Sequence, residues 1–209
     1  MGDSSSAIRG SLFGSAFGDA LGKRTEFLSV EQIEQRYGTF ESLRLVGVPA
    51  LVTDDTQMAL AVADAIMHVS AFTPEQCEPA LRTTFVQWLN DPKNDRALGA
   101  TCLQACENLE HGIRWQDATI IRSKGCGANM RVTPIGCLPH VSATERAALA
   151  QFQAALTHAH PTALAAADLT AWTMAFLRQR PTLDEVLTQI RAYAKSQHDV
   201  YYEAWLGDL

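Results

Sequence analysis

Hydrophobic residues recur along most of this chain at intervals of three and four, the spacing of a helix that buries one face. The stripe that follows Thr53 ends near Val69 and is succeeded by several others of the same period. Such stripes favour core packing over cofactor sites, so the sequence predicts an all-α protein with one compact domain over residues 1–209. The stripes are Met58, Val62, Ala65, Ile66 and Val69; Cys77, Leu81, Phe85 and Trp88; Leu98, Cys102, Ala105 and Leu109; Leu149, Phe152, Ala155 and Leu156; Leu164, Ala165, Leu169, Trp172 and Phe176; and Leu183, Val186, Leu187, Ile190 and Ala194.

Polar residues mark where several of these helices begin. Four hydroxyl residues are each followed three positions later by Gln or Glu, the pattern of a capping box. Pro74 and Pro161 suit a first helical position. No segment shows the sustained alternation of a strand, although 43–52 is compatible with extended backbone. Two segments are predicted to be loops, namely part of 23–52 and the whole of 124–140. The four capping pairs are Ser29 with Gln32, Thr73 with Gln76, Ser142 with Glu145, and Thr182 with Glu185.

The first predicted helix, residues 5–22, carries a glycine at every fourth position: Gly10, Gly14, Gly18 and Gly22. Each glycine inside a helix costs about 1 kcal/mol relative to alanine. A repeated cost of this kind indicates that another backbone or a ligand lies close to this face. Close helix packing alone is the favoured explanation for Gly10 and Gly14, whereas Gly18 and Gly22 lie nearer the following loop.

Composition narrows the class of protein. The 209 residues are 47% hydrophobic and 19% charged, as in a globular domain with a real core. The net charge of −6 argues against non-specific nucleic-acid binding, which usually needs a basic face. Five cysteines without a CxxC pair predict buried thiols in a reducing compartment and no zinc site. No apolar run reaches the roughly 20 residues of a membrane span, and no secretory signal is evident, so we expect a cytoplasmic protein without membrane contact.

The stretch Thr53-Asp54-Asp55-Thr56 holds the most informative chemistry. It opens a helix, so Thr53 is the predicted N-cap and the two aspartates occupy the first turn. Oxygen ligands gathered at a rigid helix start suit a hard divalent cation. The alternative is that both carboxylates only offset the helix dipole.

Three other segments carry candidate chemistry. Gly18-Asp19-Ala20-Leu21-Gly22 leads to Glu26; Gly125-Cys126-Gly127-Ala128-Asn129-Met130-Arg131 precedes Pro134-Ile135-Gly136; and Thr157-His158 ends a helix. Each has an ordinary explanation when taken alone. Glycine-rich loops often mark tight turns, an isolated glutamate is usually solvated, and an isolated histidine is usually a cap or part of the core.

In this order and spacing, the four segments resemble the ADP-ribosylglycohydrolase family over most of residues 7–165. The resemblance implies a compact all-α enzyme that uses two Mg²⁺ or Mn²⁺ ions. It would cleave the N- or O-glycosidic bond between ADP-ribose and a protein side chain or a small acceptor. Partners would therefore be an ADP-ribosylated protein or an ADP-ribose-containing small molecule.

The resemblance also implies roles for single residues. Thr53, Asp54 and Asp55 would be metal ligands, with Asp54 and Glu26 catalytic and Glu26 on a mobile loop over the substrate. The residues expected to line the ADP-ribose cleft are Gly125, Gly127, Asn129 and Met130, with His158 near the ribose or the phosphates.

One departure from the family pattern concerns the second metal. Members carry a further metal motif of the Gly-Asp-Thr-Asp type near the C-terminus, and Gly207-Asp208 lacks the following Thr-Asp. The second site is therefore expected to be incomplete, whether the chain is a fragment, a natural short form or one part of an assembly such as a homo-oligomer. Three functions stay open: a metal-dependent hydrolase, a catalytically impaired ADP-ribose-binding module, and a helical domain without a ligand.

Overall fold

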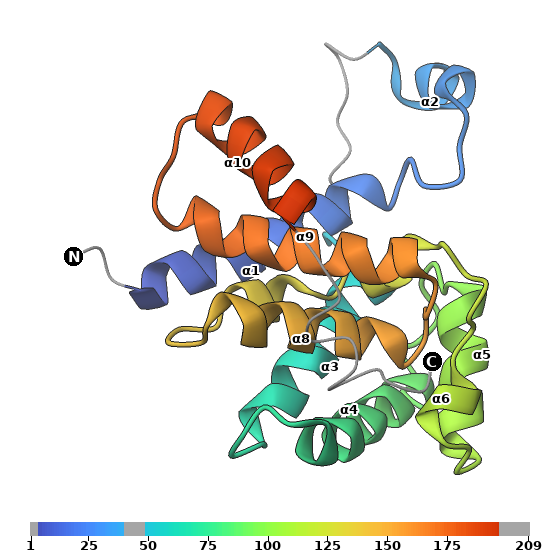
Figure 1. Ribbon diagram of the computed structural model, residues 1–209. Helices are drawn as coiled ribbons and strands as arrows, with labels where there is room; N and C mark the ends of the chain where they lie inside the picture. Colours follow the sequence, from blue (N-terminus) through green and yellow to red (C-terminus); the bar gives the residue numbers. More distant parts are fainter. Residues whose placement is uncertain (1–3, 40–48, 197–209) are drawn as a thin grey trace.

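The computed structural model describes residues 4–39 and 49–196, and every regular element in these two ranges is helical (Figure 1). The prediction of an all-α fold is confirmed. No helix in the described ranges is long and apolar enough to cross a lipid bilayer. The elements are α1 (Ser4–Gly22), α2 (Val30–Tyr37), α3 (Asp54–Met67), α4 (Pro74–Leu89), α5 (Ala100–Glu110), α6 (Trp115–Ala118), η2 (Cys126–Ala128), α7 (Thr133–Gly136), α8 (Ala143–Ala155), α9 (Pro161–Leu177) and α10 (Leu183–Ser196).

The core lies where α3, α4, α5, α8 and α9 meet. α3 packs against α4, and α8 runs beside α9 (Figure 1). The stripes predicted after Thr73 and after Ser142 are fully buried, as are most residues of the stripe after Thr53. Burial of these apolar faces is the main favourable term for the fold. Core side chains with almost no exposure include Met58, Val62, Leu81, Phe85, Leu109, Ile135, Leu149, Phe152 and Leu156.

The predicted burial of the last two helices was partly wrong. α9 buries a face of mostly small residues against α8, namely Ala163, Leu164, Ala167, Asp168 and Ala171. Ala165 is exposed, and of the aromatic residues predicted for the core, Trp172 stacks on Tyr193 of α10 and Phe176 stacks on Trp172. The ring of Trp172 lies 4.5 Å from that of Tyr193 and 5.1 Å from that of Phe176. α9 therefore packs against α8 on one side and α10 on another, and a single hydrophobic stripe predicts only one buried side.

On α10, Leu183 is 73% exposed and Leu187 is 48% exposed, so the predicted core stripe does not form within the described residues. Strong amphipathic spacing alone therefore overestimates burial at this end of the fold. Residues 40–48, which include part of the segment expected to be extended, lie outside the described residues. The terminal residues Gly207 and Asp208 lie outside them as well.

Three of the four predicted capping boxes form, at Ser29, Ser142 and Thr182. The box at Thr73 does not form: its side chain makes no cap hydrogen bond, and Oε1 of Gln76, which would accept from the Thr73 backbone nitrogen, instead accepts hydrogen bonds from the turn at Ser70 and Ala71. The segment 124–140 was predicted to be loop but contains η2 and α7. Gly136 permits that second helix to press on α9, since an added Cβ would lie 2.5 Å from Cβ of Met174.

The glycine ridge of α1 does not contact another backbone in the described structure. A Cβ added at Gly10, Gly14, Gly18 or Gly22 would meet nothing within 4 Å. Two of the explanations offered by the sequence, a close backbone and close helix packing, are therefore wrong for the described residues, and the third, a ligand near this face, stays a prediction. Helical geometry places Phe13 and Phe17 on the same side as Gly10 and Gly14, and both phenylalanines are largely exposed. The opposite side of α1 meets α3 and α7.

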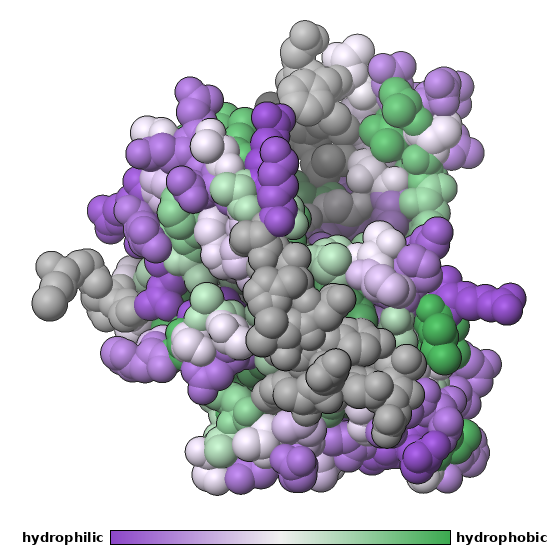
Figure 2. All heavy atoms as spheres, in the orientation of Figure 1, coloured by the Kyte–Doolittle hydropathy of each residue, from purple (hydrophilic) through white to green (hydrophobic). Residues whose placement is uncertain are grey.

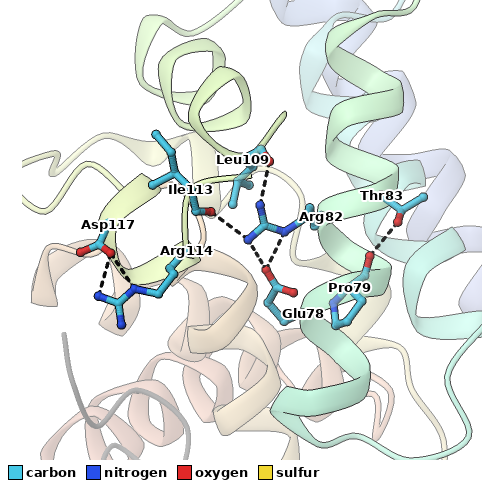
Figure 3. Close-up of polar contacts among 8 residues, drawn as sticks. All are labelled: Glu78, Pro79, Arg82, Thr83, Leu109, Ile113, Arg114 and Asp117. Carbon is cyan, nitrogen blue, oxygen red and sulfur yellow. Dashed lines mark hydrogen bonds and ion pairs between the residues drawn. The ribbon is translucent and has the colours of Figure 1, made fainter. Parts of the chain in front are cut away.

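Arg82 of α4 fixes the position of α5 (Figure 3). Its guanidinium donates to the carbonyl oxygens of Leu109 and Ile113 at 2.7 and 3.0 Å and pairs with Glu78. These carbonyl groups belong to the C-terminal end of α5 and the turn after it, where a cation is favoured. The opposite end of α5 begins beside α3, so this clamp also helps to place the functional site.

α2 lies apart from the packed helices and buries no side chain (Figure 1). In the face shown in Figure 2, hydrophilic side chains predominate and hydrophobic ones form separate patches, one of them in the region of α2. Val30 at the start of α2 is 66% exposed. The protruding region is therefore held by local contacts rather than by the core.

Candidate functional site

Asp19 of α1 holds the first turn of α3 in place. Its carboxylate accepts hydrogen bonds from the backbone nitrogen and the hydroxyl of Thr53, at 2.9 and 2.7 Å. It also accepts from the backbone nitrogen and the hydroxyl of Thr56, at 3.1 and 2.5 Å. Thr53 is the N-cap, as predicted, and its Oγ1 accepts from the Asp55 backbone nitrogen at 3.3 Å. Asp19 therefore occupies the favoured anion position at a helix N-terminus.

The aspartate pair follows directly. Asp54 is only 4% exposed, and its carboxylate accepts one hydrogen bond from the Gly99 backbone nitrogen at 3.3 Å. Burial raises the pKa of Asp54 to about 6; the Gly99 contact opposes this rise, and the charges of Asp55 and Glu26 add to it. Asp55 is half-buried, and its pKa is raised first by burial and then by the charge of Asp19.

Glu26 lies in the turn after α1, outside the core. Partial burial raises its pKa, followed by the charges of Asp55 and Asp19. Glu26 is thus close enough to the start of α3 to feel its carboxylates, although the two segments are far apart in sequence. The next residue, Phe27, has a φ of 62° and is 85% exposed, which marks an unusual backbone at this turn.

A cavity of about 230 Å³ opens between α1, α3 and the segment that leads into α7. Asp19 and Asp55 contribute carboxylates to its wall, and Met130 and Thr133 line the side toward α7. Ser15 of α1 and Thr133 share a hydrogen bond of 3.3 Å across it. The structure therefore brings the predicted Asp55 and Met130 to one pocket.

The glycine-rich loop lies directly on the His158 ring. A Cβ added at Gly127 would lie 2.9 Å from Sγ of Cys102 and 3.0 Å from Cε1 of His158. At Gly125 the corresponding atoms are Oγ of Ser123 at 3.3 Å and Nε2 of His158 at 3.4 Å. Glycine is needed at 127 because only a residue without a side chain permits this approach.

His158 is 2% exposed, so the structure places it behind the loop rather than on an open surface. Burial, followed by the positive charge of Arg131, lowers the pKa of His158 to about 4. The imidazole is therefore neutral near pH 7. Its Nδ1 shares a hydrogen bond of 2.8 Å with the Thr157 hydroxyl.

Asn129 follows η2 and contributes an unusual polar atom. Its Oδ1 is buried and has no hydrogen-bond partner among the described residues. Buried polar atoms are nearly always paired, and an orphan of this kind is expected where a ligand or water binds. Asn129 directly follows the loop 125–127, but of the residues predicted to line the ADP-ribose cleft only Met130 lines the cavity beside α1 and α3.

The donor set near α3 suits a cation only in part. Asp54, Asp55 and the hydroxyl of Thr53 supply the oxygen ligands that Mg²⁺ and Mn²⁺ prefer. The Thr53 hydroxyl donates a hydrogen bond to Asp19, so its oxygen keeps a lone pair that could accept or bind a cation. Within residues 4–39 and 49–196, however, no three His, Cys, Asp or Glu side chains are grouped as a metal centre. These residues are thus fit to hold one side of an ion.

Cys102 of α5 joins the two halves of the site. Its Sγ lies beneath Gly127, and burial, opposed by Arg131 and reinforced by Asp54, raises the pKa of its thiol. The carboxylates and the glycine loop therefore flank the first turn of α5. The sequence interpretation assigned no function to Asp19, Arg131 or Cys102. Asp19 and Arg131 each carried a signal, since they lie inside the quoted segments Gly-Asp-Ala-Leu-Gly and Gly-Ala-Asn-Met-Arg, whereas Cys102 carried none.

Comparison with known proteins gives a consistent result. Residues 2–209 match the family model described as ADP-ribosylglycohydrolase. An uncharacterized protein from Archaeoglobus fulgidus is 33% identical over 89% of this chain and 62% of its own length. The ADP-ribosyl-[dinitrogen reductase] glycohydrolase of Rhodospirillum rubrum is 32% identical over 73% of this chain and 51% of its own length.

An ADP-ribosylarginine hydrolase from Serratia proteamaculans is 28% identical over 81% of this chain and 46% of its own length. The chain therefore spans about half the length of the named enzymes that it matches. A solved structure described as an ADP-ribosylglycohydrolase-related protein complex aligns with a TM-score of 0.64 at 24% identity. The alignment covers 100% of this chain and 69% of the solved one, and supports the fold.

Proposed function

This chain belongs to the ADP-ribosylglycohydrolase family, and we propose that it supplies the core of a metal-dependent hydrolase that removes ADP-ribose from a modified acceptor. The acceptor is a protein side chain or a small molecule joined through an N- or O-glycosidic bond. Two relatives are named for such hydrolysis, one as an ADP-ribosyl-[dinitrogen reductase] glycohydrolase and the other as an ADP-ribosylarginine hydrolase. Each step below is assigned to residues of this chain.

The glycine loop is the proposed nucleotide side of the site. Gly125 and Gly127 have no side chains that would cover the backbone amide groups of this loop. Such amides bind phosphate oxygens without a basic patch, which suits a chain of net charge −6. The unpaired Oδ1 of Asn129 and the Met130 side chain would contact the ribose part of the ligand.

The start of α3 is the proposed reaction side. Thr53, Asp54 and Asp55 would hold one Mg²⁺ or Mn²⁺ ion, while a second ion of the kind found in the family would need further ligands. A bound ion would lower the pKa of water and offset negative charge. Asp19 keeps the first turn of α3 rigid, and rigid ligand groups bind ions more tightly because less ordering is needed.

Glu26 is proposed to orient the attacking water or to assist the leaving group. Glycosidic cleavage passes through a state with positive charge on the ribose ring, which nearby carboxylates stabilise. The raised pKa of Glu26 makes proton transfer near neutral pH easier than for an isolated glutamate. Asp54 also has a raised pKa, which is about 6 in the absence of metal, and this likewise favours proton transfer near neutral pH.

One observation carries the proposal more than any other: the buried carboxylate of Asp54 and the half-buried carboxylate of Asp55 lie in the first turn of α3 without an arginine or lysine partner among the described residues. The charge of Glu26 adds to the rise in the pKa of Asp54, and the charge of Asp19 adds to the rise in the pKa of Asp55. Among the described residues, none of these four carboxylates forms an ion pair. Buried like charges are costly unless a cation neutralises them. A divalent ion at this point would offset that cost and supply the chemistry.

The test is release of ADP-ribose from an ADP-ribosylarginine substrate in the presence of Mg²⁺ or Mn²⁺. The wild-type chain is compared with the double variant Asp54→Asn/Asp55→Asn. We expect the double variant to lose both metal binding by calorimetry and turnover, with its helical content unchanged. Asp64→Asn is the matched control, because Asp64 lies on the same helix with its side chain half exposed.

Unchanged metal affinity in the double variant would exclude the assignment of these ligands. Wild-type metal binding without turnover would instead favour an ADP-ribose-binding module. That second function has its own support, since the loop and His158 form without any contribution from the carboxylates. Calorimetric titration with ADP-ribose alone separates the module from a domain that binds nothing.

A further inference from the structure

Arg131 is the least expected group in the core. Its side chain is completely buried, yet no carboxylate among the described residues pairs with it. Burying a cation is unfavourable unless hydrogen bonds replace its hydration. The guanidinium finds five substitutes: Oε1 and the carbonyl oxygen of Gln153 at 2.6 and 2.7 Å, the Thr157 hydroxyl at 2.7 Å, Sγ of Cys102 at 3.8 Å, and the Phe85 ring at 4.4 Å from its centroid.

The contact to Thr157 has a defined direction. Arginine has donors only, so Oγ1 of Thr157 must accept this hydrogen bond. The hydroxyl keeps a single proton to donate. Two acceptors are within reach, Nδ1 of His158 at 2.8 Å and the Ala154 carbonyl oxygen at 3.5 Å. The shorter contact takes the proton, since hydrogen bonds of hydroxyl groups weaken beyond about 3 Å.

That choice sets the state of the histidine. Neutral imidazole carries one proton, and an Nδ1 that accepts leaves the proton on Nε2. The opposite tautomer would make the Thr157 oxygen accept from both Arg131 and His158, with only the 3.5 Å contact left to its own proton. The Nε2–H form gives Arg131, the Thr157 hydroxyl and Nδ1 of His158 each their shorter partner.

Nε2 is the edge of the ring that meets the glycine loop. It lies 3.4 and 3.1 Å from the positions that a Cβ would take at Gly125 and Gly127. Among the described residues, Nδ1 is the ring atom with a hydrogen-bond partner, so the Nε2 proton has no protein acceptor. A donor is thus held behind the loop where the ligand is expected.

We propose that Arg131 is a positioning residue, which acts through Thr157 to hold His158 as the Nε2–H tautomer and so keeps a hydrogen-bond donor directed at an anionic ligand on the loop 125–127. The ligand part of this statement rests on the proposed function, whereas the tautomer does not. Gln153 completes the arrangement by anchoring the guanidinium, and its own amide donates to the Ala128 carbonyl oxygen at 2.9 Å. The same network therefore holds both the loop and the donor beneath it.

The first measurement is the tautomer of His158 by long-range ¹H–¹⁵N correlation NMR of the histidine-labelled chain near neutral pH. The His158→Gln variant identifies the signal by its loss. We expect a protonated Nε2 and an unprotonated Nδ1 in the wild type. Thr157→Val, which removes the hydroxyl, should give a mixture of tautomers, while Thr157→Ser should restore the wild-type pattern. Arg131→Met should also shift the population toward a mixture.

A wild-type ring protonated on Nδ1 overturns the proposal, as does an unchanged pattern in both Thr157→Val and Arg131→Met. If the arginine variant fails to fold, Thr157→Val against Thr157→Ser decides on the same signature. A fully structural role for Arg131 would change stability but leave the tautomer of the folded protein as it is.

The second measurement is calorimetric affinity for free ADP-ribose. Loss of the directed donor should weaken binding about tenfold in Thr157→Val, with Thr157→Ser recovering most of the affinity. Wild-type affinity in Thr157→Val despite an altered tautomer would refute the link to the ligand. A wild type that holds the Nε2–H form but binds no ADP-ribose would refute the proposed function and leave the tautomer inference standing.

Discussion

Asp19 and Thr53 are 34 residues apart in sequence and are joined by hydrogen bonds from both the backbone nitrogen and the hydroxyl of the threonine to one carboxylate. This contact ties α1 to the helix that carries the aspartate pair. It also explains why a Gly-Asp-Ala-Leu-Gly segment and a Thr-Asp-Asp-Thr segment occur in the same chain. The two form one structural unit, with Asp19 as the anion that both threonines require.

Asp19→Asn is expected to lower the free energy of unfolding by about 2 kcal/mol, because four donors lose a charged acceptor and the amide group presents a donor to them. Urea unfolding followed by circular dichroism measures this difference. Asp64→Asn, on an exposed part of α3, should stay within about 0.5 kcal/mol of the wild type. Equal stability of the two variants would show that the network contributes little.

Gly127→Ala is expected to destabilise the fold or displace the loop, since its Cβ would lie 2.9 Å from Sγ of Cys102 and 3.0 Å from the His158 ring. Gly14→Ala is the matched change in open space, and should stabilise α1 by about 0.5 to 1 kcal/mol. Thermal unfolding of both variants tests the opposite signs. A destabilising Gly14→Ala would mean that its face packs against groups outside the described residues.

His158 should make stability depend on pH below neutrality. Its folded pKa is about 4 and its ordinary pKa is 6.5, so the unfolded chain binds a proton in this window that the folded chain refuses. Stability is therefore full above pH 6.5 and falls as the pH drops toward 4, by about 2 kcal/mol near pH 5. The variant His158→Gln should lack this component in urea titrations at about pH 7 and pH 5. Identical pH dependence in both chains would place the ring in a more hydrated setting.

Glu26→Gln is expected to reduce ADP-ribose release at least about 100-fold while shifting the melting temperature little, because the residue is exposed and lies in a turn. Kinetics with saturating Mg²⁺ and a parallel melting curve give the two quantities. Glu31→Gln, on the protruding α2, is the control for a nearby surface charge. Marked early unfolding with normal turnover would assign Glu26 a structural role.

Much of the fold follows from local patterns. The helix after Thr53, the capping box at Ser142 and the stripe from Cys77 to Trp88 were predictable because spacing and capping act within a few residues. The burial of α9 was not, since two helices compete for its faces and only the tertiary structure shows which residues meet α8. The capping box at Thr73 fails for the same reason. The donors of the Ser70 turn, which bind the Gln76 side chain, lie outside the four-residue motif.

The site shows a similar division. Asp54 and Asp55 could be found from sequence because both lie in one helical turn. The roles of Asp19 and Arg131 could not be found in this way. Asp19 binds Thr53, 34 residues away, and Arg131 binds Thr157, 26 residues away. The role of glycine at 127 likewise depends on Cys102 and His158, which reach it from other helices.

The isolation of α2 affects the time scale on which the segment around Glu26 can move. An eight-residue helix without a buried side chain is only marginally stable by itself, so its amide protons should exchange with solvent after local opening rather than after global unfolding. The amide protons of α3, a helix that buries six of its side chains, should exchange far more slowly. Glu26 lies where these two regimes meet, with its backbone nitrogen bonded to Gly22 at the end of α1. The Glu26 carboxylate is therefore expected to move with a segment that opens locally, while the aspartates at the start of α3 stay fixed.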